Sequence, residues 1–144
     1  MIKTFERSGV KFHFPSNWTV DSDETEGSGE WTVTIQSPET AFAIVSLRSD
    51  AQNLAQIANE SLAALQLEYP ELEWENAIDS IAGQPAIGHN IDFLTLDTST
   101  TSWSRCIETV NGPLLILCQV SDYDLNKNEP VLRAICASLQ IADE

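Results

Sequence analysis

Acidic side chains crowd residues 21–30, which read DSDETEGSGE. Carboxylates at this density can gather around a hard cation or form a docking patch for a basic partner. Asp21, Asp23 and Thr25 take the first, third and fifth positions of a calcium-loop pattern. The pattern then fails, because Glu26 stands where the turn glycine belongs and no glutamate occupies the closing position. We therefore expect no metal site. The segment is interpreted as a solvated loop, and its carboxylates are alternative candidates for contacting a partner: Asp21, Asp23, Glu24, Glu26 and Glu30.

His89, Trp103 and Arg105 are further side chains whose types suit a binding site. Trp103 and Arg105 fall on one face of a predicted strand, and an aromatic ring beside an arginine is common at protein interfaces. We take this pair as candidate partner contacts. His89 alternates with apolar residues along another strand, which favours a hydrogen-bonded histidine in the core or in a cleft. A small-ligand or metal-binding domain with a cleft near His89 and Trp103 is the alternative hypothesis.

No motif in the chain carries catalysis by itself. The sequence contains no GxSxG elbow, no HExxH helix and no paired Cys–His signature. Ser104 and Asp92 can be arranged on paper with His89 into a triad, but nothing in their spacing selects them. A phosphate-binding GxxxxGKS/T loop and a dinucleotide-binding GxGxxG turn are also absent. We therefore expect a protein that is not an enzyme and that needs no cofactor.

The three cysteines, Cys106, Cys118 and Cys136, show no CxxC spacing. A secreted domain usually pairs its thiols, so an odd number favours a reducing compartment. A three-residue loop in the predicted hairpin would place Cys106 opposite Cys118, within reach of a disulfide. A two-residue loop would place Leu117 there instead. Free thiols are the main expectation and a Cys106–Cys118 redox pair is the alternative, while Cys136 is expected to fill the core.

The charge balance limits the partners of the chain. Lys and Arg number 7 against 22 Asp and Glu, which gives a formal net charge of −15 at pH 7. Such a field repels phosphate backbones and anionic lipids, so we expect no nucleic-acid partner and no membrane partner. No run approaches the roughly 18 apolar residues of a membrane span, and the first residues do not resemble a signal peptide. Together with the thiols, these features predict a cytoplasmic protein.

The elements that position these side chains are predicted from hydrophobic periodicity and turn residues. Apolar patterns predict strands at residues 10–14, 18–20, 30–37, 41–48, 72–79, 86–96, 101–110 and 114–121. An apolar stripe at helical spacing predicts a first helix that ends at Pro70. Ser49 and Gln52 have the spacing of a capping box for this helix, and Asp50 is an alternative cap. A second helix is predicted at residues 129–139.

The length of 144 residues suits one domain, here residues 1–144. Strands are followed by a helix, then by a run of antiparallel strands and a last helix. This segregated order indicates an α+β fold, an antiparallel sheet flanked by helices, rather than alternating βαβ units. The same patterns assign Trp31 and Trp74 to apolar strand faces, and therefore to the core. A sheet edge or a poorly covered face is also compatible with a homodimer.

Three segments carry patterns of a known superfamily. The first is FHFPSNW at residues 12–18, which is similar to an early apolar strand followed by Pro and Trp. The second is IAGQPAIGHNIDF at residues 81–93, which is similar to the Gly-x-Pro-Ala start of a long strand. The third is LRAICASLQI at residues 132–141, which is similar to the last helix and its final Ser-apolar segment. Together these segments resemble the PsbP-like/DcrB-like superfamily. The resemblance covers nearly the whole chain and implies an α/β/α sandwich around an antiparallel sheet.

Members of this superfamily include a photosystem II extrinsic subunit, a Ran-binding nuclear import factor and chaperones of secreted toxins. Most of them bind or assemble proteins and have no recognised catalytic apparatus. The resemblance therefore implies a binding or assembly module that holds a protein or peptide partner on a sheet face or in a groove beside a helix. None of the three segments carries a functional motif of the family, so no site residue is transferred from it.

Overall fold

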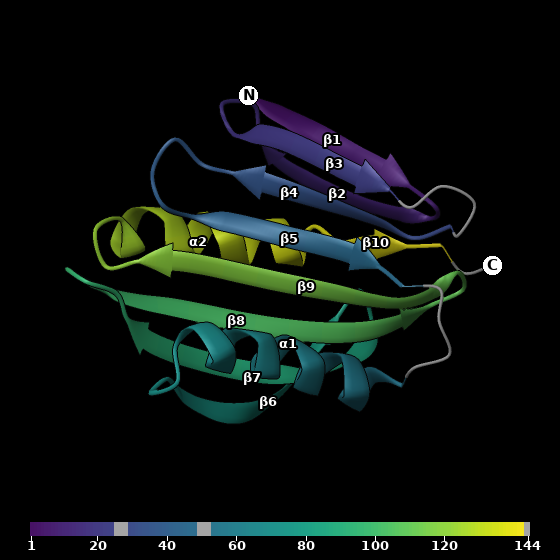
Figure 1. The fold of residues 1–144 in the computed structure, drawn as a ribbon. Helices are drawn as coiled ribbons and strands as arrows, with labels where there is room; N and C mark the ends of the chain where they lie inside the picture. Colours follow the sequence, from purple (N-terminus) through teal and green to yellow (C-terminus); the bar gives the residue numbers. More distant parts are fainter. Residues whose placement is uncertain (25–28, 49–52, 143–144) are drawn as a thin grey trace.

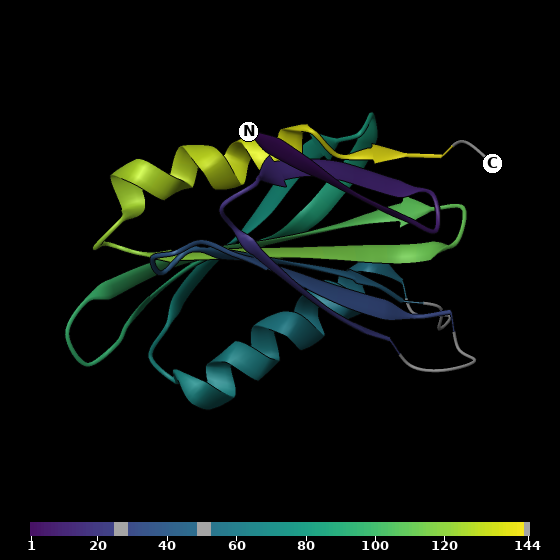
Figure 2. The ribbon, with the colours of Figure 1, turned by 90° about the horizontal axis from the view of Figure 1, so that it is seen from above.

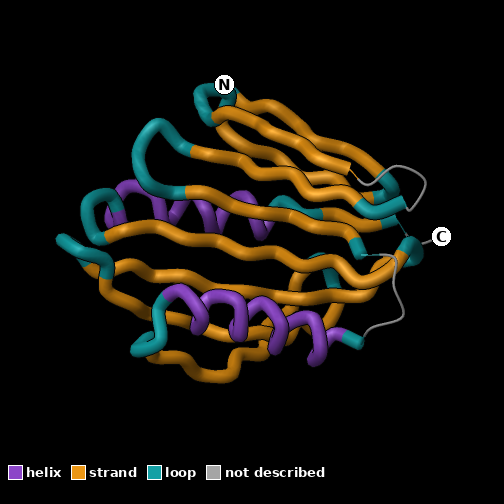
Figure 3. Tube along the Cα trace, viewed as in Figure 1, coloured by secondary structure: helices purple, strands orange, loops and turns teal. Residues whose placement is uncertain are grey.

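The computed structural model describes residues 1–24, 29–48 and 53–142. These residues form two antiparallel sheets and two helices, with the loops gathered at the ends of the strands (Figure 1, Figure 3). The large sheet has the order β3-β4-β5-β9-β8-β7-β6, and the small sheet has the order β1-β2-β10. The strands are β1 (Ile2–Arg7), β2 (Val10–Pro15), β3 (Thr19–Glu24), β4 (Trp31–Gln36), β5 (Phe42–Leu47), β6 (Glu73–Ile81), β7 (Gln84–Leu94), β8 (Ser99–Thr109), β9 (Gly112–Ser121) and β10 (Gln140–Ile141). The helices are α1 (Leu54–Glu68) and α2 (Leu125–Ala137).

The large sheet is the middle layer of the molecule. In Figure 2, α1 covers one face of it, and α2 and the small sheet cover the other. α1 packs over β7, β8 and β9, whereas α2 contacts β9 and β2. This arrangement confirms the predicted α+β fold, an antiparallel sheet between helices, and adds a small sheet to the layer that holds α2. In the part of the chain that the structure describes, no helix is long and apolar enough to cross a membrane.

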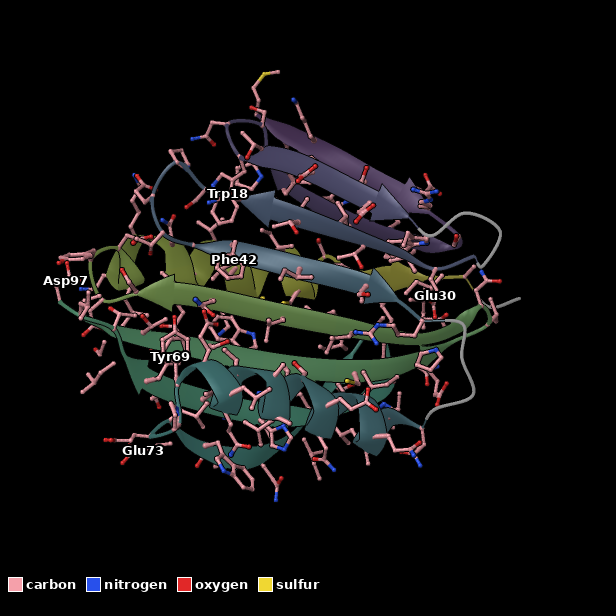
Figure 4. All side chains as sticks on the ribbon, in the orientation of Figure 1. Trp18, Glu30, Phe42, Tyr69, Glu73 and Asp97 are labelled. Carbon is pink, nitrogen blue, oxygen red and sulfur yellow. The ribbon has the colours of Figure 1, made fainter. Side chains whose placement is uncertain are left out.

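Two hydrophobic cores lie on opposite faces of the large sheet. The core beneath α2 and the small sheet is the larger, and the predicted apolar face of β4, with Val33 and Ile35, is buried in it. Complete burial of one such side chain contributes about 1.5–3 kcal/mol. The core beneath α1 is smaller and consists of two clusters, one of them around Ile57. In the other cluster Tyr69, labelled in Figure 4, stacks on Phe93 with ring centroids 4.2 Å apart.

Asn53 caps the N-terminus of α1. Its side chain accepts a hydrogen bond from the backbone N–H of Gln56 at 2.8 Å, and the Gln56 side chain accepts one from the backbone N–H of Asn53 at 3.0 Å. This reciprocal pair is the capping box of the helix, because Asn at the N-cap and Gln at the third helical position can each accept a backbone hydrogen bond. It lies one turn later than the predicted capping box. The prediction that Ser49 and Gln52, or Asp50, cap the helix is therefore wrong; these residues lie outside the described ranges.

The N-terminal part of the chain contains more strand than the sequence predicts. β1 pairs with β2 along its whole length although most of its residues are exposed, and Phe5 packs against the larger core. β3 extends into the acidic segment as far as Glu24, because its backbone groups pair with those of β4 whatever its side chains are. The prediction of a loop over residues 21–30 is therefore wrong for its first four residues. The next four, which include Glu26, lie outside the described ranges.

The β8–β9 hairpin turns at residues 110–111, one residue before the gap that the predicted strands leave at residues 111–113. Thr109 pairs with Gly112, so Cys106 lies opposite Leu115 and both predicted registers are wrong. The Thr109 hydroxyl holds this turn, because it donates to the Gly112 carbonyl oxygen at 2.7 Å. Gly112 has a φ of 123°, a left-handed conformation that favours glycine. It is the first residue of β9 and not part of the turn.

Trp31 is buried as predicted, but Trp74 is not. β6 is an edge strand of the large sheet, and Trp74 and Ile78 on one of its faces are 47% and 77% exposed. The alternation of β6 does not produce a buried face, because α1 packs over β7, β8 and β9 rather than over this edge.

Candidate functional site

A cleft lies between the end of α2 and the tip of the β6–β7 hairpin. In Figure 2 the teal tip of this hairpin rises from the sheet to the level of the yellow α2. The hairpin and α2 form the two walls of the cleft, and β8 forms its floor. We call this space, which has a volume of about 460 Å³, the Arg105 cleft. It is lined by Asp79, Ser80, Ile81, Ala82, Trp103, Arg105, Arg133, Cys136 and Ala137.

Arg105 is buried at the floor of this cleft, with 4% of its surface exposed. Its Nε donates to Asp79 Oδ2 at 2.6 Å, and its Nη2 donates to Asn90 Oδ1 at 2.8 Å. Nη1 donates to the backbone carbonyl oxygens of Ser104 at 2.7 Å and of His89 at 3.2 Å. A buried cation is tolerated when it is paired and hydrogen-bonded. These contacts therefore fix the guanidinium in one orientation and account for four of its five N–H groups.

Gly88 allows β7 to approach the backbone that holds Arg105. A Cβ atom placed at Gly88 would lie 1.9 Å from the Ser104 carbonyl oxygen, which is far inside contact distance. The same carbonyl oxygen accepts the 2.7 Å hydrogen bond from Arg105. The Ser104 hydroxyl also accepts a hydrogen bond from the backbone N–H of His89 at 3.1 Å. A side chain at position 88 would therefore displace the segment of β8 that supports the arginine.

Arg133 adds a second positive charge to the cleft from α2. Its Cζ lies 4.1 Å from the centroid of the buried Trp103 ring, which is a cation–π contact. Its Nη2 also donates to Glu129 Oε2 at 3.2 Å, one helical turn away. The structure thus brings Trp103 and Arg105 into one cleft and adds Arg133, which sequence reasoning missed. The sequence does contain one signal, because Glu129 and Arg133 are four residues apart, which is the spacing of an ion pair on one face of a helix.

The acidic candidates lie at the other end of the molecule. Asp21 and Asp23 are exposed on β3, the edge of the large sheet opposite to β6. Glu24 ends β3, and Glu30, labelled in Figure 4, directly precedes β4. Charges on an edge strand hinder its pairing with the edge of another molecule, which is a structural role for Asp21 and Asp23. Among the described residues, no group of three or more His, Cys, Asp or Glu side chains is placed to hold a metal ion.

His89 lies on the other face of the sheet, beneath α1. It pairs with Ser104 across β7 and β8, and Trp103 is the next position along β8. Neighbouring positions of a strand point to opposite faces, so Trp103 enters the larger core while His89 faces α1. The hypothesis of one cleft near His89 and Trp103 is therefore wrong.

The pocket around His89 has a volume of about 260 Å³. The imidazole is 3% exposed and meets the Trp74 ring edge-on, with centroids 5.2 Å apart. Its Nδ1 has no hydrogen-bond partner among the described residues. Burial, and after it the positive charge of Arg105, lower the pKa of His89, so the neutral ring is favoured. The pocket is lined by Ala55, Ala58, Asn59, Asn76, Ala77, Ile78, Ile87, Gly88 and His89.

An apolar groove of about 550 Å³, here called the α2 groove, lies between α2 and the β1–β2 hairpin. Its polar groups come from His13 and Ser138, and the Ser138 hydroxyl is already engaged. That hydroxyl donates to the Ile135 carbonyl oxygen at 2.7 Å and accepts from the His13 backbone N–H at 2.9 Å. The family resemblance implies a groove beside a helix but does not place it at α2, because periodicity within a helix does not show which element lies next to it. The groove is lined by Ile2, His13, Phe14, Pro15, Pro130, Val131, Ala134, Ile135 and Ser138.

Comparison with known proteins identifies the fold. No protein-family model and no curated protein sequence matches the chain. PsbP (CyanoP) from Synechocystis sp. PCC 6803 is similar in structure, with a TM-score of 0.62 and 12% identity over 98% of this chain and 92% of that one. LpqN of Mycobacterium tuberculosis, involved in cell envelope biogenesis, has a TM-score of 0.60 and 11% identity over 99% and 91%. A Pseudomonas aeruginosa protein of unknown function has a TM-score of 0.58 and 13% identity over 99% of both chains. The chain therefore has a PsbP-like fold, as its three resembling segments imply.

Proposed function

We propose that the chain is a binding module that holds an apolar segment of a partner protein in the α2 groove. The observation that carries this proposal is the lining of the groove. Val131 and Ala134 of α2, with Ile2 and Pro15 of the small sheet, surround one continuous space of about 550 Å³ on the surface. Apolar surface gains about 25 cal/mol per Å² when it leaves water. Continuous apolar patches on an otherwise charged protein are typical of interaction sites.

The charge of the chain selects among the segments that could enter this groove. A net charge of −15 favours an apolar segment that is flanked by Lys or Arg. Attraction of this kind accelerates association and weakens with salt, whereas the apolar contact itself does not. The same charge disfavours a second copy of the chain as the partner. The proposal assigns no catalysis, and the three unpaired thiols fit a reducing, cytoplasmic location.

Selection of a displayed peptide library on the immobilised protein tests the proposal. Enriched peptides are expected to combine apolar residues with basic flanks, and labelled copies are expected to bind in fluorescence anisotropy. Ala134→Asp places a carboxylate in the groove. It is expected to weaken binding by roughly tenfold or more, because burying an unpaired charge costs over about 1.4 kcal/mol.

Ala137→Asp is the matched control. It makes the same change three residues later in the same helix, but Ala137 lines the Arg105 cleft. It is expected to leave the affinity within about twofold, since surface substitutions away from the contact have small effects. Melting curves of both variants show whether each remains folded. Binding that survives Ala134→Asp, or that is lost only with Ala137→Asp, would contradict the α2 groove as the site.

A small ligand in the His89 pocket is a second candidate function. It is favoured by the buried Nδ1 that has no hydrogen-bond partner among the described residues. A hydroxyl or amide N–H of a ligand could donate to this nitrogen. The pocket volume of about 260 Å³ restricts such a ligand to fewer than roughly ten heavy atoms, since a water molecule occupies about 30 Å³ of liquid. Titration with small alcohols and amides, read by the backbone amide NMR signals of Ala58 and Ala77 in the pocket lining, should show saturable shifts that His89→Phe removes. No saturable shift in the unsubstituted protein would exclude the ligand.

A further inference from the structure

Two thiols meet at the wall of the Arg105 cleft. Cys118 of β9 is completely buried, and Cys136 of α2 is partly exposed where it lines the cleft. Their Sγ atoms are 3.7 Å apart. A disulfide bond is about 2.05 Å long, so each sulfur needs to move by less than about 1 Å if both share the approach. Cys106, which the alternative prediction pairs with Cys118, lies instead on the other face of the sheet beneath α1.

The two thiols differ in their surroundings. The hydrogen bond with Cys118, and the positive charges of Arg133 and Arg105, lower the pKa of Cys136, although burial opposes them. The same hydrogen bond and complete burial raise the pKa of Cys118. Asp79 also lines the cleft, but its carboxylate is bound to Arg105 at 2.6 Å. Cys136 is therefore the more acidic of the two thiols, and it is also the one that lines the cleft.

We propose that Cys136 and Cys118 form a peroxide-reactive pair that alternates between two thiols and one disulfide. The Cys136 thiolate attacks one oxygen of a hydroperoxide and the O–O bond breaks. The departing oxygen takes a proton and leaves as an alcohol or water, while Cys136 becomes a sulfenic acid. The Cys118 sulfur then attacks the Cys136 sulfur, its proton passes to the sulfenic hydroxyl, and water leaves as the S–S bond forms. The pair loses two electrons, which the peroxide gains, and a dithiol reductant restores both thiols.

Access and position distinguish this pair from two ordinary core cysteines. Cys118 has no exposed surface of its own, so oxidant reaches it through Cys136. The cleft volume of about 460 Å³ admits small peroxides, because a water molecule occupies about 30 Å³ of liquid. The bond would join β9 to α2. This helix separates the Arg105 cleft from the α2 groove. Oxidation of the pair does not depend on what the α2 groove binds.

Treatment of the reduced, folded protein with hydrogen peroxide tests the pair without any substitution. After the remaining thiols are alkylated, digestion at Arg, Lys and Glu separates the three cysteines, because Glu108 lies between Cys106 and Cys118. Mass spectrometry is expected to find Cys118 linked to Cys136 within one chain, with two hydrogens lost. Cys106, whose pKa burial raises to about 12, is the internal control and is expected to stay a thiol. Linkage through Cys106, linkage between chains, or no oxidation where free cysteine is oxidised would overturn the proposal.

Three variants assign the two roles. Cys118→Ala removes the second thiol, so dimedone is expected to trap a sulfenic acid on Cys136. Arg133→Gln removes a nearby positive charge and is expected to slow oxidation by roughly threefold or more. Cys106→Ala is the matched control and is expected to leave the rate unchanged. A dimedone adduct on Cys106, or none on Cys136 of the folded Cys118→Ala variant, would contradict the roles; if that variant does not fold, the unsubstituted protein still decides the linkage.

Discussion

Replacement of Asp79 by alanine removes the carboxylate that pairs with the buried Arg105. The Arg105 Nε loses an acceptor at 2.6 Å, while Asn90 and two backbone carbonyl groups remain bonded to the guanidinium. A hydrogen bond to a charged group contributes about 1.5–3 kcal/mol. The Asp79 side chain is 50% exposed, so water compensates for part of the loss. We therefore expect Asp79→Ala to reduce the free energy of unfolding by roughly 1.5 kcal/mol.

This loss can be measured by urea titration and by calorimetry. With an unfolding entropy of about 2.1 cal/mol/K per residue, a chain of 144 residues melts roughly 3 °C lower for each kcal/mol lost. Asp79→Ala is thus expected to lower the melting temperature by about 5 °C. Asp79→Asn keeps an acceptor oxygen without the charge, and about half of the loss is expected.

Asp92→Ala is the matched control for this experiment. Asp92 is exposed on the neighbouring strand β7 and accepts one long hydrogen bond, from Thr101 at 3.3 Å. Its removal is expected to change the free energy of unfolding by less than about 0.5 kcal/mol. Equal losses in Asp79→Ala and Asp92→Ala would show that strand propensity, and not the ion pair, sets the effect. An unchanged melting temperature in Asp79→Ala would refute the assigned role of the pair.

Gly88→Ala is expected to reduce the free energy of unfolding by about 3 kcal/mol, because its methyl group would overlap the Ser104 carbonyl oxygen. At Gly83 an added methyl group has no atom within 4 Å, so Gly83→Ala is expected to reduce the free energy of unfolding by only about 1 kcal/mol, because of its φ of 76°. Similar urea midpoints for the two variants would contradict this difference. Asn53→Ala removes the capping box and is expected to cost about 1 kcal/mol in the same titration, with faster amide exchange in the first turn of α1. Because the fold lowers the pKa of His89, the unfolded chain binds the imidazole proton more tightly than the folded chain does. Stability is therefore lost as the pH falls through about 6.5. His89→Gln should show a smaller loss between about pH 7 and pH 5.5, and an equal loss would contradict the role of the histidine.

Hydrophobic alternation predicts strands well where one face is buried. β4 and β5 fall within a residue of the predicted ranges, because their apolar faces enter the larger core. The same signal fails at the edges of the sheets. β1 contributes little to the core and escapes prediction, whereas β6 alternates although Trp74 and Ile78 stay exposed. Alternation reports that a strand is amphipathic, but not whether another layer covers it.

The candidate site can be predicted only where its residues belong to one strand. Trp103 and Arg105 stand two positions apart on β8, so they share a face whatever the rest of the fold does. Arg133 and Cys136 reach the same cleft from α2, and their placement depends on how that helix packs across the sheet. Cys118 meets Cys136 for the same reason. Periodicity within an element contains no information about contacts between layers.

The core beneath α1 is small, so this helix has fewer buried apolar contacts than the elements of the larger core. Its buried residues are Ile57, Ala58 and Leu62. Segments with few buried contacts open locally at a lower free energy than the whole protein unfolds. Cys106 lies fully buried directly beneath α1, so its thiol becomes reachable when the helix detaches. The rate at which Cys106 reacts with an alkylating reagent would therefore time the opening of one layer, separately from global unfolding, with a reporter already present in the sequence.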